Sequence, residues 1–358
     1  MLKISFLEAL NGDCILIKLM SSEASPKNIL IDGGVSATYN FRNSRGRTEN
    51  GALANLVDQL RTENQKIDLL ILTHIDDDHI DGILQWFKTD PDAYNMIGEV
   101  WFNSGKLIAE YLQEQENAAL NHIINLPNDS PDTSVCQGVD FGQFIHDKGI
   151  WRREIIIQGK DIEWHNAKFE FLSPNTIKLQ KLLKFWKKDD PGLKTSGAND
   201  YHHSIEYLIT HDSFEEDKRE PNGSSIAFIL HFEGRRYLFL GDSHPSVIVE
   251  GLKQRQITTQ EPLSVELVKL SHHGSKGNTN KELLSLIHSN HFIISTNGNI
   301  HGHPDKQLLA RLIKEKVSCQ IHFNYPERAL DIFQPEDYAF LPFKIIRSKS
   351  EFVFSNDN

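Results

Sequence analysis

Short apolar runs recur along the chain, and glycine, asparagine, aspartate or serine residues usually close them. Runs of this length and composition are typical of β-strands. Between them lie stretches whose apolar residues recur every three or four positions, which predicts helices. In the first part of the chain the expected strands are Lys3–Leu7, Cys14–Leu19, Asn28–Ile31, Leu69–Leu72 and Glu99–Phe102, and the expected helices are Ala52–Arg61, Ile83–Phe87 and Leu107–Ile124.

The second part of the chain repeats this alternation after a proline-, aspartate- and serine-rich segment, Asn128–Gly142, which predicts a loop. Strands alternating with helices in both halves favour the α/β class, as an αββα sandwich of two sheets with helices outside. We expect one domain over residues 1–358, with insertions at about 37–50, 105–150 and 175–223. The later strands expected are Glu154–Ile157, Ala167–Leu172, Ser225–Phe232, Arg236–Leu240, Val265–Leu270 and Phe292–Ser295, and the later helices are Val247–Leu252, Glu282–Ile287 and Asp305–Val317.

The strand Leu69–Leu72 runs directly into four chemically active side chains, His74, Asp76, Asp78 and His79. Imidazoles and carboxylates interleaved at the end of a buried strand are typical donors of a protein metal site. A solvated acidic loop is the alternative explanation, but such loops seldom alternate histidines with aspartates at this spacing. The pattern therefore predicts a metal site.

Three later segments also place metal-capable side chains directly after an apolar strand. They are Asp242, the pair His272-His273, and His301 with His303. Each segment alone is weak evidence, because polar loops often carry such residues. Their repetition in one chain makes coincidence a poor explanation.

In this order the motifs resemble those of metallo-β-lactamase-fold hydrolases. HxDxDH over 74–79 is similar to the HxHxDH signature of that family, with Asp76 in place of the second histidine. Gly-Asp before one strand, DGG after the next, LFLGD ending at Asp242, SHHGS over 271–275 and GHP over 302–304 resemble the nuclease domain of ComEC competence proteins. The resemblance covers roughly residues 1–311, without the insertions and the tail.

The resemblance implies a role for each matching residue. His74 and Asp76 would hold one ion, and Asp78 and His79 would hold a second ion together with His272. Asp242 would bridge both ions, and Asp32 would lie beneath the metal loop. Many relatives carry a further histidine on the strand preceding Asp242, and this chain has Asn222 to Ser225 at that point. The catalytic residues implied are Asp78 and His303, with His273 as the rival proton donor, and the substrate-binding residues are Ser275, Asn222 and Ser225.

The implied cofactors are two divalent ions, Mn or Zn, and the extra aspartate favours manganese because it makes the first site rich in oxygen. Paired ions of this kind activate water and stabilise an in-line phosphoryl displacement. The leading hypothesis is therefore a metal-dependent phosphodiesterase, a nuclease acting on DNA. The alternatives are a hydrolase of a cyclic or signalling nucleotide, a thioester, lactone or lactam hydrolase on the same fold, and a metal-stabilised binding module.

Charge constrains how a nucleic acid could bind. The 358 residues carry a net charge of −11, which argues against a protein that coats nucleic acid by charge alone. A polynucleotide substrate would need a local basic patch. One candidate is a helical face formed by Lys178, Lys181, Lys184 and Lys188, which could instead be an ordinary solvated face. The other candidate is an arginine strip formed by Arg42, Arg45 and Arg47.

Cysteines and hydropathy bear on location. Cys14, Cys136 and Cys319 are far apart, fit no zinc or redox spacing, and indicate reduced thiols. The N-terminal segment lacks a cleavage site, and no stretch approaches the ~20 apolar residues of a membrane span. We expect a cytoplasmic enzyme without a membrane partner, acting on DNA or a nucleotide; a homodimer stays open.

Overall fold

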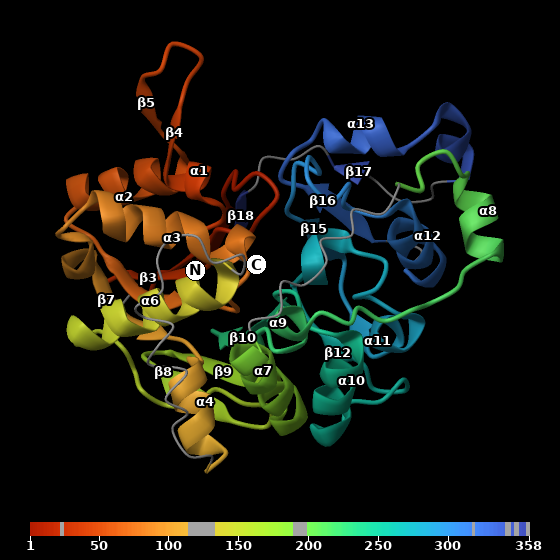
Figure 1. Cartoon of the computed structure of the whole chain (residues 1–358). Coiled ribbons are helices and arrows are strands. Elements are labelled where there is room, and N and C mark those ends of the chain that lie inside the picture. Colours follow the sequence, from red (N-terminus) through yellow and green to blue (C-terminus); the bar gives the residue numbers. More distant parts are fainter. Residues whose placement is uncertain are drawn as a thin grey trace. The chain divides into compact units, whose positions relative to one another are not determined.

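The structure is a computed structural model, and it describes residues 1–21, 25–113, 133–188, 199–316, 319–340, 345–346 and 351–355. The chain forms two compact units, each with one large β-sheet (Figure 1). Unit 1 comprises Met1–Ile156, Thr176–Lys194 and Phe352–Asn358. Unit 2 comprises Ile157–Asn175 and Thr195–Glu351.

Unit 1 is built on a six-stranded sheet with the strand order β18-β1-β2-β3-β6-β7. The pairs β1–β2 and β2–β3 are antiparallel, whereas β3–β6 and β6–β7 are parallel. Almost every residue of β3 and β6 is buried, which explains their unbroken apolar runs. The strands are β1 (Leu2–Phe6), β2 (Ile15–Leu19), β3 (Lys27–Ile31), β6 (Ile67–Ile71), β7 (Ile97–Trp101) and β18 (Glu351–Phe354).

The helices of unit 1 bury one apolar face each. In α3 the buried residues Ile80, Ile83 and Phe87 recur at helical spacing. α4 packs closely against α7 at Gly105, where a Cβ atom would lie 1.8 Å from the ring of Trp186. The helices are α1 (Ser36–Tyr39), α2 (Ala52–Thr62), α3 (Asp77–Thr89), η1 (Ala93–Met96), α4 (Gly105–Tyr111), α6 (Thr133–Asp147) and α7 (Thr176–Lys188), and a small hairpin joins β4 (Asn40–Arg42) to β5 (Thr48–Asn50).

Unit 2 is built on an eight-stranded sheet with the order β17-β16-β15-β13-β11-β10-β9-β8. The strands β8 to β11 pair antiparallel, and those from β11 to β17 pair parallel. Glu233 and Gly234 both have positive φ, of 49° and 77°, as the tight turn of the β10–β11 hairpin requires. The strands are β8 (Asp161–Trp164), β9 (Ala167–Ser173), β10 (Ala227–Phe232), β11 (Arg235–Phe239), β13 (Leu267–Lys269), β15 (His291–Ile294), β16 (Gln320–Phe323) and β17 (Ile345–Ile346), with a separate pair β12 (Leu263–Ser264) and β14 (Ile287–His288).

The helices of unit 2 share a continuous apolar core with its sheet. Leu238 of β11, Ile248 of α10 and Leu308 of α12 are all fully buried in this core. Burial of this kind is the main stabilising term of a folded domain. The helices are α8 (Ile205–Thr210), α9 (Glu220–Gly223), α10 (Pro245–Gln254), η3 (Ser271–Gly274), α11 (Lys281–Ser285), α12 (Lys306–Glu315), α13 (Arg328–Ile332) and η4 (Pro335–Phe340).

The predicted α/β class is confirmed. Each unit has the sheet and helices that one half of an αββα sandwich requires, and most predicted strands differ from the observed ones by one or two residues at their ends. The single domain with three insertions stays a prediction. The expected helix Leu107–Ile124 is present as α4 up to Tyr111, and residues 114–124 lie outside the described ranges. No helix in those ranges is long and apolar enough to cross a bilayer.

Two local predictions were wrong. The expected loop Asn128–Gly142 contains the first part of α6, because Val135 and Phe141 pack into the core despite the polar composition. The expected strand Glu154–Ile157 is irregular, because the side chain of Asn103 donates to the Ile156 carbonyl at 2.8 Å and accepts its N–H at 2.9 Å. A side chain thus provides the hydrogen bonds that a neighbouring strand would otherwise supply.

One boundary also differs from expectation. α3 begins at Asp77, six residues before the predicted start, so the second half of the metal motif lies on a helix. Carboxylates in a first helical turn are favoured by the helix dipole. The arginine strip, which falls in the insertion expected at about 37–50, lies on the β4–β5 hairpin.

A pair of histidines links two strands of unit 2 and gives a first prediction. His291 Nδ1 lies 2.9 Å from His322 Nε2, and His322 is 4% exposed. Burial and the neighbouring His291 lower the pKa of His322 to about 4, from 6.5. Between these two values the unfolded chain binds a proton that the folded chain does not, so stability should rise with pH across this window.

We therefore expect acidification from pH 6.5 to 5 to reduce the free energy of unfolding by up to about 2 kcal/mol through His322 alone. Urea denaturation of wild type and His322→Gln at both pH values measures the effect, because glutamine cannot titrate. The variant should lose less stability over this interval than wild type. Equal losses in the two proteins would contradict the assignment.

Candidate metal centre

The metal motif of unit 1 spans the turn from β6 into α3. His74 is 4% exposed, and Asp76 is the residue that precedes the first turn of α3. Asp78 and His79 lie within that first turn, and His79 is fully buried. The structure therefore brings the four predicted donors of this motif together at one end of the unit 1 sheet.

Asp32 holds this turn from below, in the place that the resemblance implied. Its two carboxylate oxygens accept the backbone N–H and the hydroxyl of Thr73, both at 2.7 Å. One of them also accepts His79 Nδ1–H at 2.8 Å. Burial raises the pKa of Asp32, although the hydrogen bonds and charge of His79 oppose it.

The Asp32 contact also decides which nitrogen of His79 can bind a ligand. With Nδ1 donating to Asp32, Nε2 keeps its lone pair, and this atom lies 3.8 Å from Asp78 Oδ1. His74 repeats the arrangement: Nδ1 is 3.0 Å from Thr73 Oγ1, and Nε2 is 4.0 Å from Asp76 Oδ2. Both histidines thus direct Nε2 towards a carboxylate.

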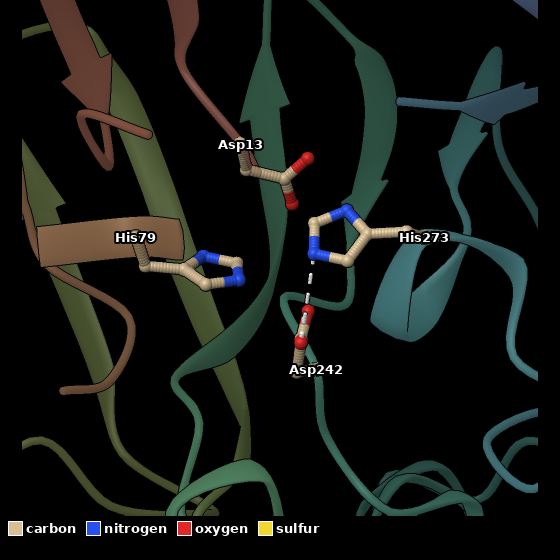
Figure 2. Close-up of side chains that lie close together, drawn as sticks. All are labelled: Asp13, His79, Asp242 and His273. Carbon is tan, nitrogen blue, oxygen red and sulfur yellow. Dashed lines mark ion pairs between the residues drawn. The ribbon is translucent and has the colours of Figure 1, made fainter. Parts of the chain in front are cut away.

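Asp13 is a donor in unit 1 that the sequence reasoning did not select. Asp13 is 1% exposed. One of its carboxylate oxygens lies within 4.8 Å of a ring nitrogen of His79 (Figure 2). Its N–H donates to the Asp78 carbonyl at 3.1 Å, and a Cβ on Gly12 would lie 1.8 Å from that same oxygen. The Gly-Asp pair before β2 was its signal in the sequence, because only glycine allows this approach.

Asp242 is the central donor of unit 2 and lies just after β11. It is 1% exposed, and its backbone is held on both sides. Its N–H donates to Ser225 Oγ at 3.1 Å, and its carbonyl accepts from Asn278 Nδ2 at 3.0 Å. Ser225 thus supports the predicted bridging residue directly.

His272 and His273 both approach Asp242 in the 3₁₀ turn η3. Both have positive φ, of 48° and 52°, which few non-glycine residues adopt. Nε2 of each lies 3.8 Å from Asp242 Oδ2, and Figure 2 marks the His273 contact with a dashed line. His273 Nδ1 lies 2.8 Å from the Ser295 carbonyl, and His272 Nδ1 lies 3.0 Å from Asn278 Oδ1.

The two histidines differ in their surroundings. His273 is 1% exposed, whereas the side chain of His272 is 18% exposed. His272 Nδ1 also lies 3.4 Å from Asp217 Oδ2. Burial lowers the pKa of His272, but Asp242 and Asp217 outweigh burial and raise it to about 9. The resemblance implied His272 as the metal ligand. In unit 2, however, His272 and His273 both place Nε2 at the same distance from Asp242 Oδ2.

Asp217 is a second residue that the sequence did not reveal, since it lies in a polar stretch without periodicity. It accepts a hydrogen bond from Asn222 Nδ2 at 2.6 Å, and His244 Nε2 lies 3.7 Å away. Burial raises its pKa, but His272 and these hydrogen bonds hold the pKa well below its usual range. Asn222 and Ser225 are fully buried, and they form hydrogen bonds with Asp217 and Asp242 respectively. Ser275 is 8% exposed. The role of all three in substrate binding stays a prediction.

His303 lies in the loop before α12, in unit 2. Its ring centroid is 5.1 Å from that of His272, and its Nδ1 is 3.5 Å from Asp305 Oδ2. Burial lowers the pKa of His303, and Asp305 opposes that effect. Tyr201 and Arg328 secure this loop: the Tyr201 hydroxyl donates to the Pro304 carbonyl at 3.1 Å, and Arg328 Nε lies 3.4 Å from the His303 carbonyl.

The lysine face expected on α7 is present in unit 1. Leu179, Leu182 and Leu183 are buried, whereas Lys181 and Lys184 are exposed and Lys178 is partly exposed. Lys188 ends the helix, and its side chain lies outside the described residues. The helix is therefore amphipathic, as its spacing predicted.

The chemistry of these donors fits a divalent metal. In His74, His79, His272 and His273, Nδ1 has a hydrogen-bond partner and Nε2 lies 3.8–4.0 Å from a carboxylate oxygen. That separation is too long for a hydrogen bond. It suits two donors that each lie about 2.0–2.2 Å from one ion. Metal-binding histidines usually have their other ring nitrogen held in this way.

Comparison with known proteins gives structural neighbours only. No protein-family model and no curated protein matches this chain. The diiron β-hydroxylase CmlA from Streptomyces venezuelae is 13% identical, with a TM-score of 0.39, over 86% of this chain and 46% of its own. The metallo-beta-lactamase fold protein YhfI from Bacillus subtilis is 11% identical, with a TM-score of 0.35, over 93% and 94%.

A metallo beta lactamase from Hirschia baltica is 11% identical, with a TM-score of 0.28, over 71% of this chain and 80% of its own. The chain thus spans less than half of the β-hydroxylase and nearly all of YhfI.

Proposed function

We propose that this protein is a metal-dependent phosphodiesterase that hydrolyses DNA. The observation that carries the proposal is the shared orientation of four histidines, each held at Nδ1 and each directing Nε2 towards a carboxylate. A structural histidine needs only one such contact, whereas a ligand needs its second nitrogen available and aimed. The DNA substrate rests on the resemblance to ComEC-type nucleases.

The proposed ligands are the acidic and imidazole donors of the described motifs. Bound divalent ions would supply an activated water and would stabilise charge on the phosphoryl oxygens. Half of the donors are carboxylates, which favours manganese over zinc. The ligands would be Asp13, His74, Asp76, Asp78 and His79 of unit 1 and Asp242, His272 and His273 of unit 2. The resemblance implies that Asp242 serves both ions.

The remaining residues would orient the ligands and move a proton. Asp32 and the Ser295 carbonyl fix His79 and His273 in the form that leaves Nε2 as an acceptor. His303 would donate a proton to the departing oxygen, and Asp305 beside it would favour the protonated imidazole. Tyr201 and Arg328 would keep the His303 backbone in place.

The proposal is tested by incubating the purified protein with single-stranded DNA, double-stranded DNA, RNA and cyclic dinucleotides, each with Mn²⁺, Mg²⁺, Zn²⁺ or Fe²⁺. We expect metal-dependent cleavage of DNA, strongest with Mn²⁺. Turnover of cyclic dinucleotides alone would make the protein a signalling-nucleotide hydrolase. Turnover of a thioester or lactone, without any phosphodiester cleavage, would reject the proposal.

A prediction on substrate binding concerns the lysine face of α7. Replacing Lys178, Lys181, Lys184 and Lys188 by glutamine should weaken DNA binding and flatten its salt dependence, by about 0.7–0.9 for each phosphate that the helix no longer neutralises. Fluorescence anisotropy at several salt concentrations measures the slope. Turnover should decrease more on DNA than on bis-p-nitrophenyl phosphate, because this small substrate is too short to contact the lysines of α7. Equal decreases would mean that the helix supports the fold, and unchanged DNA cleavage would make it a solvated face.

A further inference from the structure

The β4–β5 hairpin is a small, exposed element of unit 1, and it extends beyond α1 and α2 in Figure 1. Every residue from Phe41 to Asn50 is exposed except Asn43. Asn43 organises the tip: its Oδ1 accepts the N–H groups of Arg45 and Arg47 at 2.9 and 3.0 Å. The tip therefore has a defined backbone although it is exposed to solvent.

Three arginines give this hairpin a net positive charge. Arg42, Arg45 and Arg47 are exposed, and none forms an ion pair within the described part of the chain. Other arginines of this acidic protein do form such pairs, for example Arg61 with Asp90. The single carboxylate on the hairpin, Glu49, instead accepts a hydrogen bond from Asn43 Nδ2 at 2.5 Å.

Phe41 adds an aromatic ring to the same hairpin. Phe41 is 42% exposed, and the residue opposite it on β5 is the charged Glu49. An exposed aromatic ring on the same small hairpin as three guanidinium groups that form no ion pair in the described ranges matches the chemistry of a nucleic-acid strand, which has phosphates on one edge and stacking bases on the other.

The base of the hairpin is fixed to α3, the helix that carries Asp78 and His79. Gln85 Nε2 of α3 donates to Asn40 Oδ1 at 3.1 Å. Tyr39, at the end of α1, stacks on Trp86 of α3 with ring centroids 6.3 Å apart. A strand held by the hairpin would therefore keep a fixed relation to the metal ligands on α3.

We propose that the β4–β5 hairpin is a binding arm for single-stranded DNA, in which Arg42, Arg45 and Arg47 contact phosphates and Phe41 stacks on a base. A single strand is favoured over a duplex because a ring can stack only on a base that its neighbours leave exposed. The inference rests on the proposed function for its substrate, but the binding step can be measured without hydrolysis.

The test measures anisotropy of a labelled 20-nucleotide oligothymidylate with the purified full chain, without added metal, over a salt series. R42Q/R45Q/R47Q should reduce the slope of log affinity against log salt by about 2, at about 0.7 per phosphate. Phe41→Ala should weaken binding about 5-fold or more and leave the slope unchanged, because stacking releases no counterions. Thermal melting confirms that each variant is folded.

A matched control removes three positive charges elsewhere: K66Q/K88Q/K314Q replaces exposed lysines that, like the arginines, have no ion pair in the described ranges. An equal change of slope in this control, or an unchanged slope in the arginine variant, would contradict the proposal that the hairpin binds single-stranded DNA. Binding of wild type to phosphatidylglycerol vesicles but not to the oligonucleotide would overturn it in favour of a membrane contact. Failure of the proposed function would show separately, as no wild-type turnover of bis-p-nitrophenyl phosphate with any metal.

Discussion

Replacing Asp242 by alanine should abolish hydrolysis and release at least one metal ion. Asp242 is 1% exposed, and the Nε2 atoms of His272 and His273 both lie 3.8 Å from its Oδ2. A carboxylate shared by two ions contributes to both, so the effect should exceed the roughly 10–100-fold that removal of an outer-shell partner costs. Elemental analysis of the purified variant, alongside turnover of bis-p-nitrophenyl phosphate, measures both effects.

The control for this experiment is Glu261→Ala, which removes an exposed carboxylate in the same unit and should change neither metal content nor turnover. Circular dichroism separates loss of metal from loss of fold. Undiminished metal in folded Asp242→Ala would contradict the bridging role. Release of one ion but not the other would show which donor set binds independently.

The parts of the fold that could be predicted are those in which a few adjacent residues determine the outcome. β3 and β6 are buried on both faces, so their apolar runs predict strands whatever surrounds them. α6 could not be predicted in this way, because Val135 and Phe141 become a buried face only when the rest of unit 1 is present. Segment 154–157 has the composition of a strand, but a distant side chain, Asn103, takes its hydrogen bonds.

The candidate site follows the same division. His74, Asp76, Asp78 and His79 lie within one short motif, so their spacing alone indicates a metal site. Asp217 cannot be found from spacing, because it is 55 residues before His272 and meets it only through the folding of unit 2. Local chemistry was thus predictable, and the residues that orient it over long sequence separations were not.

Replacing His303 by asparagine should leave both metals in place and slow hydrolysis only where the leaving group needs a proton. His303 is held at its backbone by Arg328 and at Nδ1 by Asp305, so asparagine should fit the same loop. General acid catalysis is typically worth roughly 10²–10⁴-fold, and we expect kcat to fall by that factor for a nucleoside 3′-oxygen leaving group. p-Nitrophenolate leaves without a proton, so bis-p-nitrophenyl phosphate should be much less affected.

The pH dependence gives an independent check on the same residue. Because burial lowers the pKa of His303 below its usual 6.5, the protonated imidazole is already becoming scarce as the pH rises towards that value. The advantage of wild type over His303→Asn on the poor leaving group should therefore shrink with rising pH. His301→Asn is the matched control, since its ring lies 6.0 Å from that of His303 in the same loop, and it should leave the ratio of the two substrates unchanged. A uniform decrease on both substrates in His303→Asn would reassign His303 to phosphate binding or metal ligation, and no decrease on either substrate would contradict its role as the proton donor.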